Sequence, residues 1–221
     1  MKNLFILFLF FVLSSKTVLS QDLTIDSPKI KFTIYGGASL PQGDFGSSSI
    51  RDEKAGFGKT GFCAMAEGSK LLTSSTDLLA SVSVSLNGFD TKEVEKQMEG
   101  SGFSVSAANY INTWAMTGVK YTVPYSEKVK IYGTGQIGIL FSKRPDLTIS
   151  SSIFEISETS KTKLATTFAY GFGAGVQLEK INIGLRYNSG NPEYKPDESG
   201  ESFDIATSSV SILQLMIGFN F

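Results

Sequence analysis

The sequence predicts an all-β fold, an eight-stranded antiparallel up-and-down transmembrane β-barrel, on three observations. Eight stretches alternate apolar residues with polar or small ones at a period of two, which is typical of strands. The segments that connect them are alternately short and long, as in barrels that cross a membrane. The last stretch runs to the aromatic Phe221, and a strand of this kind closes such a barrel.

The predicted strands differ in the regularity of their alternation. The third is the clearest, because apolar residues from Leu78 to Leu86 interleave with mostly polar ones up to Asn87. The seventh, from Ile181 to Tyr187, is nearly as regular. In order, the predicted strands cover residues 29–39, 60–72, 76–88, 110–123, 128–142, 163–178, 180–189 and 209–221.

The connections assign the two ends of the predicted barrel. Short turns are expected at Thr73–Ser75, Pro124–Glu127 and Glu179, whereas the long loops cover residues 40–59, 89–109, 143–162 and 190–208. With an even number of strands, both termini lie on the short-turn side, facing the periplasm, and the long loops face outward. The sheet must close, because unpaired backbone groups are very costly in hydrocarbon.

The N-terminus resembles an export signal. Lys2 precedes an apolar run from Leu4 to Leu13, and small residues follow as far as Ser20. We therefore expect a signal peptide at residues 1–20, a short segment at 21–28 and the barrel at 29–221, in the bacterial outer membrane. The alternative, an N-terminal anchor helix, would need about 20 apolar residues.

A soluble β-sandwich or lipocalin-like barrel is the competing prediction, because its strands alternate as well. A soluble core would need one consistently apolar face turned inward. Here the less apolar face of most strands carries Ser, Asn, Gln, Thr, Lys, Arg or Gly, which favours the membrane barrel.

Four segments carry a resemblance to a known family. Residues 35–46, YGGASLPQGDFG, resemble the first strand and loop of the outer membrane protein β-barrel domain proteins of Bacteroidota. Residues 114–124 and 132–138 resemble the fourth and fifth strands of that family, and 214–221, QLMIGFNF, resemble its last strand. The resemblance implies the size and topology of OmpX and OmpA-type barrels, a family that includes PorT-like members.

The same resemblance implies a role for the terminal aromatics and two classes of partner. Phe219 and Phe221 would form the signal that the barrel-assembly machinery reads, after periplasmic chaperones have delivered the chain. Most members of the family have no defined activity, so the resemblance indicates location rather than function.

Polar residues on the inward face predict a network inside the barrel. An eight-stranded barrel is just wide enough to be filled by side chains, and buried charges must be paired. We therefore expect a plug in which Glu67 faces Arg186 or Lys120; a narrow path for small solutes is the alternative. The predicted polar network comprises Lys31, Glu67, Lys120, Gln136, Gln177, Arg186 and Gln214, with Tyr35 and Trp114 also inside.

The opposite face of the strands predicts contact with the lipid bilayer. The clearest lipid-facing candidates are Val82, Val84, Ile183, Leu185, Leu215 and Ile217. Each lies in the apolar register of a regularly alternating strand, so a charge placed there would face hydrocarbon.

The composition argues against enzymatic chemistry. The chain has no His, which excludes Ser-His-Asp triads, Cys-His dyads and His-ligated zinc. The Gly133–Gly138 segment matches a dinucleotide-binding pattern, but it lies inside a predicted strand with no helix after it. Cys63 is expected to be a small wall residue. We predict no catalytic residue, no cofactor and no metal site, and a net charge of −1 indicates no nucleic-acid partner.

The long loops are the remaining candidate surface. Asp90 and Glu93 fit a capping box for one or two helical turns, and Phe45 and Phe57 lie among charged residues of the first loop. Exposed aromatics of this kind suit a protein or glycan partner, or lipopolysaccharide. The sequence thus predicts a non-enzymatic outer-membrane protein with a role in envelope integrity, adhesion or secretion, and a small-solute channel as the alternative.

Overall fold

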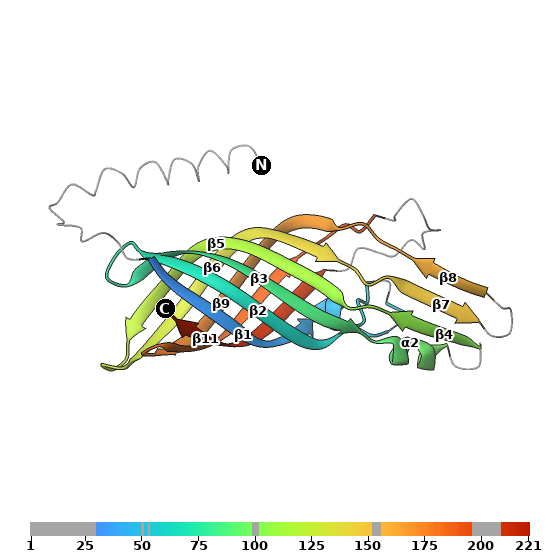
Figure 1. The fold of residues 1–221 in the computed structure, drawn as a ribbon, viewed down its shortest axis with the longest axis horizontal. Coiled ribbons are helices and arrows are strands. Elements are labelled where there is room, and N and C mark those ends of the chain that lie inside the picture. The colour runs from blue at the N-terminus through green and yellow to red at the C-terminus, as the bar shows by residue number, and fades with distance from the viewer. Residues whose placement is uncertain (1–29, 50, 53, 99–101, 152–155, 196–208) are drawn as a thin grey trace.

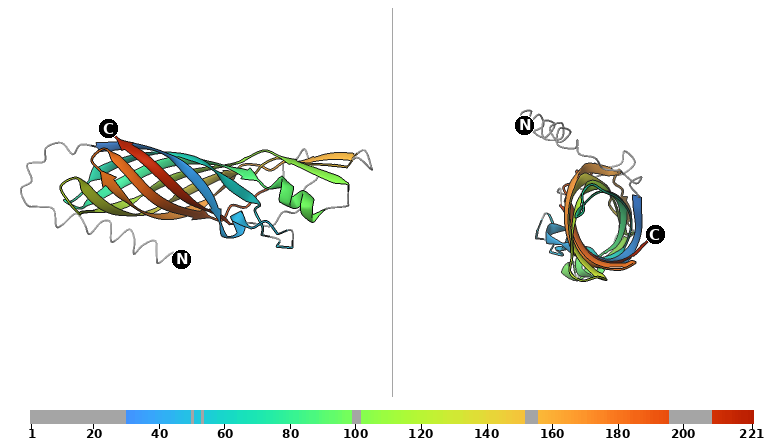
Figure 2. Two further views of the ribbon diagram at one scale, coloured as in Figure 1. Left: turned by 90° about the horizontal axis from the view of Figure 1, so that it is seen from below. Right: turned by 90° about the vertical axis from the view of Figure 1, so that its left-hand side faces the viewer.

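Eight strands close into an antiparallel barrel in the computed structural model of the protein (Figure 1). The structure describes residues 30–49, 51–52, 54–98, 102–151, 156–195 and 209–221. Around the barrel the strand order is β1-β11-β10-β9-β6-β5-β3-β2, and the ring is visible along the barrel axis in Figure 2. The barrel strands are β1 (Ile30–Gln42), β2 (Gly58–Leu71), β3 (Thr76–Phe89), β5 (Tyr110–Pro124), β6 (Val129–Lys143), β9 (Ala165–Leu178), β10 (Ile181–Gly190) and β11 (Val210–Asn220).

The eight predicted strands are confirmed, with small shifts at their ends. The largest is in β1, which continues past residue 39 because it pairs with β11 as far as Gln42 and Ser211. The pairing of β1 with β11 joins the first barrel strand to the last one and closes the sheet.

Both described ends of the barrel chain lie at the short-turn end. Ile30 begins β1 there, and the backbone N–H of Phe221 donates to the carbonyl of Phe32 at 2.9 Å. This agrees with the predicted placement of the termini. The predicted signal peptide, 1–20, and the segment 21–28 lie outside the described residues.

Burial follows the alternation of the strands, with polarity reversed relative to a soluble protein. In β3 the inward residues include Asp77, Ser81 and Asn87, all buried, whereas the outward Leu78 and Val82 are exposed. A side chain in a strand points to the face opposite its neighbours, so one strand can present a polar and an apolar face at once. The sequence alternation therefore determines which residues fill the barrel.

Glycines make room for large side chains inside the barrel. A Cβ atom on Gly184 would lie 2.4 Å from the hydroxyl of Tyr132, and one on Gly175 would lie 2.5 Å from it. The Gly133–Gly138 segment lies inside β6, which continues to Lys143 with no helix after it. These glycines therefore shape a barrel wall.

A second sheet extends beyond the barrel at the end opposite the short turns (Figure 1; Figure 2). Its strands are β4 (Phe103–Ala107), β7 (Leu147–Ser151) and β8 (Ile156–Ser160), in the order β4-β7-β8. The sequence prediction treated these segments as loops and was wrong here. Each strand has five residues, and such short stretches give little alternation to recognise.

Two short helices complete the described structure. The helix α2 (Thr91–Gln97) begins at Asp90, whose carboxylate accepts from the N–H of Glu93 at 3.3 Å, which confirms the predicted helical turns. The 3₁₀ helix η2 (Gly43–Gly46) follows β1. In the described part of the chain, no helix combines the length and hydropathy that a membrane crossing requires.

Candidate functional site

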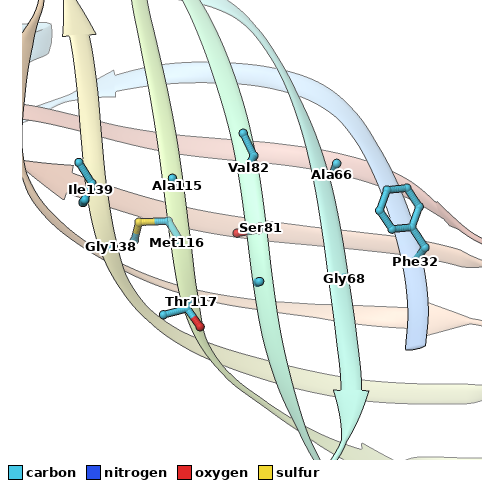
Figure 3. A pocket seen from close by; sticks show the side chains of 11 residues that line it. Phe32, Ala66, Gly68, Ser81, Val82, Ala115, Met116, Thr117, Gly138 and Ile139 are labelled. Atoms are coloured by element: carbon cyan, nitrogen blue, oxygen red, sulfur yellow. The ribbon is translucent and has the colours of Figure 1, made fainter. Parts of the chain in front are cut away.

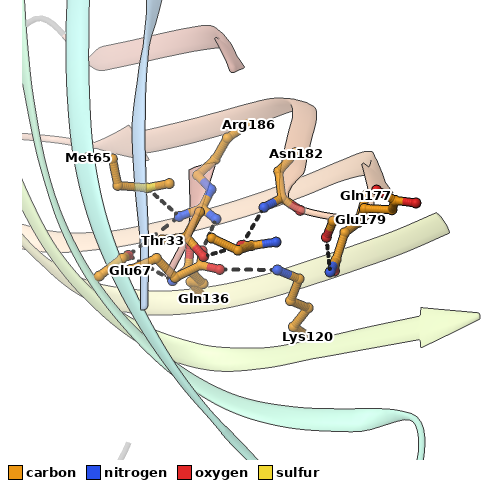
Figure 4. Close-up of polar contacts among 11 residues, drawn as sticks. Thr33, Met65, Glu67, Lys120, Gln136, Gln177, Glu179, Asn182 and Arg186 are labelled. Carbon is orange, nitrogen blue, oxygen red and sulfur yellow. Dashed lines mark hydrogen bonds and ion pairs between the residues drawn. The ribbon is translucent and has the colours of Figure 1, made fainter. Parts of the chain in front are cut away.

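A buried cluster of three charges occupies the interior of the barrel (Figure 4). Glu67 on β2 lies between two cations: the Lys120 ammonium is 3.2 Å from its Oε1, and the Arg186 guanidinium is 2.7 Å from its Oε2. The three residues are at most 5% exposed and come from strands far apart in the sequence. One carboxylate thus ties β2 to β5 and to β10.

Neutral groups complete the surroundings of this charge cluster. Arg186 also donates to the sulfur of Met65 at 2.9 Å and to the hydroxyl of Ser81 at 3.4 Å. Gln136 donates to the same hydroxyl at 3.0 Å. The Lys120 ammonium lies 4.4 Å from the centre of the Tyr132 ring, a cation–π distance. Each charge therefore has a close partner, as buried ions require.

The structure brings four of the seven predicted network residues together: Glu67, Lys120, Gln136 and Arg186. Gln214 is fully buried and pairs with Arg186 across β10 and β11, but the hydrogen bond that its Oε1 accepts comes from Asn188, at 3.3 Å. Tyr35 and Trp114 are also buried inside the barrel, as their register suggests.

Two predicted members of the network do not join it. Lys31 is exposed near the start of β1, where its ammonium can reach water at the barrel end. Gln177 is half-buried and donates to the carbonyl of Glu179 in the adjoining turn, at 3.3 Å. Both have an inward register but lie near the short-turn end, so solvent and turn carbonyls replace the interior partners.

Sequence reasoning missed several contributors to the interior. Met65, Ser81 and Tyr132 contact the charges. In the sequence, the only feature that could have indicated this is their position in the inward register of their strands. A further group at the short-turn end joins Thr33 and Asn182, which both donate to Asn220, at 2.7 and 2.6 Å.

An apolar seal closes the other end of the interior. Phe45 of η2 is fully buried and packs edge-on against Tyr110, with ring centres 4.9 Å apart. The prediction that Phe45 is an exposed loop aromatic was therefore wrong, because its ring gains more by covering the apolar mouth of the barrel than by facing water. The seal is made by Phe45, Tyr110, Trp114, Met116, Leu140, Ala169, Val210 and Ile212.

Aromatic and polar groups surround this seal on the loop side. The buried Arg144 guanidinium lies 5.6 Å from the centre of the Tyr194 ring. The Tyr194 hydroxyl bonds to that of Ser142, and burial raises the pKa of Tyr194 above its usual value. The interior is thus obstructed twice, by the charge cluster and by the apolar seal.

The outer wall presents the predicted lipid-facing residues. All six have exposed side chains: Val82, Val84, Ile183, Leu185, Leu215 and Ile217. Phe219 and Phe221, the predicted assembly signal, are also exposed, and their rings pack edge-on with centres 5.3 Å apart.

The two edges of the second sheet differ. At the β4 edge, α2 packs alongside, and Glu95 accepts from the N–H of Val105 at 2.8 Å. At the other edge, β8 pairs with β7 on one side and with no described strand on its second side. Its Ser157, Glu158 and Thr159 are exposed. This edge is therefore the open one within the described part of the chain.

Comparisons with known proteins give structural likenesses but no family. No known family profile and no curated protein matches the sequence. Neisserial surface protein A is 10% identical over 86% of this chain and 95% of its own, with a TM-score of 0.49. Ail, the attachment invasion locus protein of Yersinia pestis, is 18% identical over 88% and 99%, with a TM-score of 0.45. A major outer membrane protein of Thermus thermophilus is 13% identical over 87% and 100%, with a TM-score of 0.47.

Removing the central carboxylate should destabilise the barrel. We expect Glu67→Ala to lower the free energy of unfolding by about 3–5 kcal/mol, because two buried cations lose their shared partner. The measurement is urea unfolding of the protein folded into lipid vesicles. The matched control is Lys31→Ala, a charged residue of the same inward register at an exposed position, which should change the free energy by less than about 0.5 kcal/mol. Equal effects of the two substitutions would contradict the structural role of the cluster.

Proposed function

We propose that this protein spans the outer membrane of a bacterium and presents its second sheet at the cell surface as a non-enzymatic recognition element. The observation that carries the proposal is the reversed polarity of the barrel. Leucine, isoleucine, valine and phenylalanine side chains are exposed around the wall, whereas Glu67, Lys120 and Arg186 are buried inside it. This distribution of side chains is stable when hydrocarbon surrounds the barrel, because the apolar side chains then face an apolar medium. Closure of the barrel leaves no unpaired strand edge in the hydrocarbon.

The orientation follows from the two unlike ends. The short turns and both described ends of the barrel chain lie together, and the second sheet lies at the opposite end. In the proposed topology, residues 1–20 act as a cleaved signal peptide and the short turns face the periplasm. Phe219 and Phe221 would be read by the assembly machinery after delivery by chaperones, and the loop end would meet lipopolysaccharide.

The obstructed interior argues for recognition rather than transport. A small solute would have to pass both the apolar seal at Phe45 and the charge cluster around Glu67. The described residues also contain no group of three acidic or cysteine side chains that could hold a metal ion. The proposed function therefore lies on the surface, at the second sheet.

The open edge of β8 suits an extended protein segment. An edge strand offers unpaired N–H and C=O groups that another strand can complete, and main-chain hydrogen bonds then supply affinity. The neighbouring edge at β4 is covered by α2 and Glu95, so the two edges are not equivalent. We propose a surface protein as the partner, in an adhesive role; a glycan is the competing partner.

A charge on the outer wall tests the membrane placement. We expect Leu215→Arg to destabilise the protein in lipid vesicles by about 2–4 kcal/mol, because its side chain would face hydrocarbon. The matched control is Ile181→Arg at the short-turn end of β10, with a cost of about 0–1 kcal/mol. Denaturant unfolding from vesicles measures both. If the two substitutions cost the same, or neither costs anything, the wall does not face lipid.

Conductance tests whether the interior is sealed. In planar bilayers, the wild-type protein should give no large, stable current steps, because the seal and the charge cluster both block the axis. A variant with Phe45→Ala and Glu67→Ala serves as a comparison for leakage. Reproducible porin-sized steps from the wild type would favour the small-solute channel instead.

Trimming the second sheet tests the recognition role. Cells that carry a form lacking Leu147–Ser160 should lose adherence to protein-coated surfaces, because the open β8 edge is gone. The matched control, Lys128→Gln in a short turn at the opposite end, should adhere like the wild type. Heat-modifiable gel mobility shows that each variant still forms the barrel. Undiminished adherence of the trimmed form would contradict the proposal, and loss of binding to glycan-coated surfaces alone would identify a glycan partner.

A further inference from the structure

A recess lies on the outer wall, across strands β1, β2, β3, β5 and β6 (Figure 3). Most outward residues of its floor are small, with Val82 on β3 among them, and larger side chains stand at its sides, Phe32 on β1 and Ile139 on β6. The floor residues include Ala66, Gly68, Ala80, Ala115 and Thr117. The lining is almost entirely carbon, so the recess can hold a hydrocarbon group but no polar one.

Strand register makes this recess continuous. Gly68 pairs with Ala80, and Ala80 with Thr117, in one row across the wall. The next row joins Ala66, Val82 and Ala115 in the same way. On the other side of the barrel most outward residues are large, including Phe168, Phe172, Leu185, Leu215 and Ile217, although Ala174 on β9 is small. The recess is therefore a local feature of one side of the wall.

A lysine stands at one end of the recess. Lys70 follows Gly68 on the same face of β2 and pairs with Ile30 and Leu78, which are both exposed and apolar. Among the described outward-facing strand residues at the short-turn end, it is the only charged one. Its ammonium makes no ion pair with a described residue.

We propose that this recess and Lys70 bind one anionic glycerophospholipid, with an acyl chain along the recess and the headgroup phosphate on Lys70. The inference rests on the proposed membrane placement. An outward lysine is tolerated only near the edge of the hydrocarbon, which puts Lys70 at the headgroup level on the short-turn side. Gly68 and Ala66 lie about 7 and 13 Å further along the strand, within the acyl-chain region.

The size of the recess favours a lipid over a second copy of the chain. Eleven residues line it. A stable interface between proteins takes about 20–30 residues on each side. A single acyl chain, in contrast, is narrow enough to lie between Phe32 and Ile139, and the lone cation beside the recess complements a phosphate. The charge and the shape thus point to the same ligand.

Native mass spectrometry of the full chain, folded in detergent, tests the site. The probes are phosphatidylglycerol and phosphatidylcholine with identical acyl chains. One variant fills the recess, Ala66→Leu with Ala115→Leu, and should weaken binding of both lipids at least about tenfold. Lys70→Gln should weaken binding of phosphatidylglycerol about fivefold and that of phosphatidylcholine less, because the choline ammonium offsets the charge of its phosphate. The matched controls, Ala174→Leu on the bulky side of the wall and Lys180→Gln in a short turn, should bind like the wild type.

Two outcomes would overturn the inference. Equal lipid retention by the wild type and the recess-filled variant would show that the recess holds no lipid. A dimer that the recess-filled variant alone fails to form would assign the surface to a second copy instead. A separate measurement tests the membrane placement itself. If that placement is wrong, the wild type will not fold into liposomes, and its gel mobility will not change on heating. Loss of lipid binding in a variant whose gel mobility still changes on heating supports the site.

Discussion

Closure of the sheet between β1 and β11 is the constraint on which the rest of the structure depends. Ten residue pairs, from Thr33–Asn220 to Gln42–Ser211, join the first barrel strand to the last. Without this seam, both strands would expose a row of unpaired backbone groups along the wall. In hydrocarbon those groups would have no alternative partner, so partial closure is not a stable state there. Closure also fixes the small cross-section that forces the interior side chains together.

The interior adapts to this enclosure by combining charges with glycines. Glu67, Lys120 and Arg186 reach across the axis from three strands, and each finds a partner of opposite sign or an aromatic ring. Gly175 and Gly184 leave the space that the Tyr132 ring occupies. The same narrow space that excludes a wide aqueous path therefore holds a polar core of paired charges.

The sequence predicted the barrel well because its alternation carries the relevant information locally. A period of two assigns Val82 outward and Ser81 inward without any knowledge of the neighbouring strands. The pairing of Glu67 with both Lys120 and Arg186 depends on contacts across 53 and 119 residues, which alternation alone does not specify. The same limit applies to Phe45, whose burial depends on where η2 folds, and to the five-residue strands β4, β7 and β8. Lys31 and Gln177 show that inward register does not guarantee interior contact near a barrel end.

The position of Trp114 makes it an intrinsic fluorescence probe of one region of the molecule. It is the only tryptophan in the chain, it is fully buried, and it belongs to the seal beneath Phe45. Its fluorescence therefore arises from one place, which the wall separates from the outer face of the barrel. A shift in emission wavelength on addition of a ligand would mean that the loop end has rearranged, without any label having been attached.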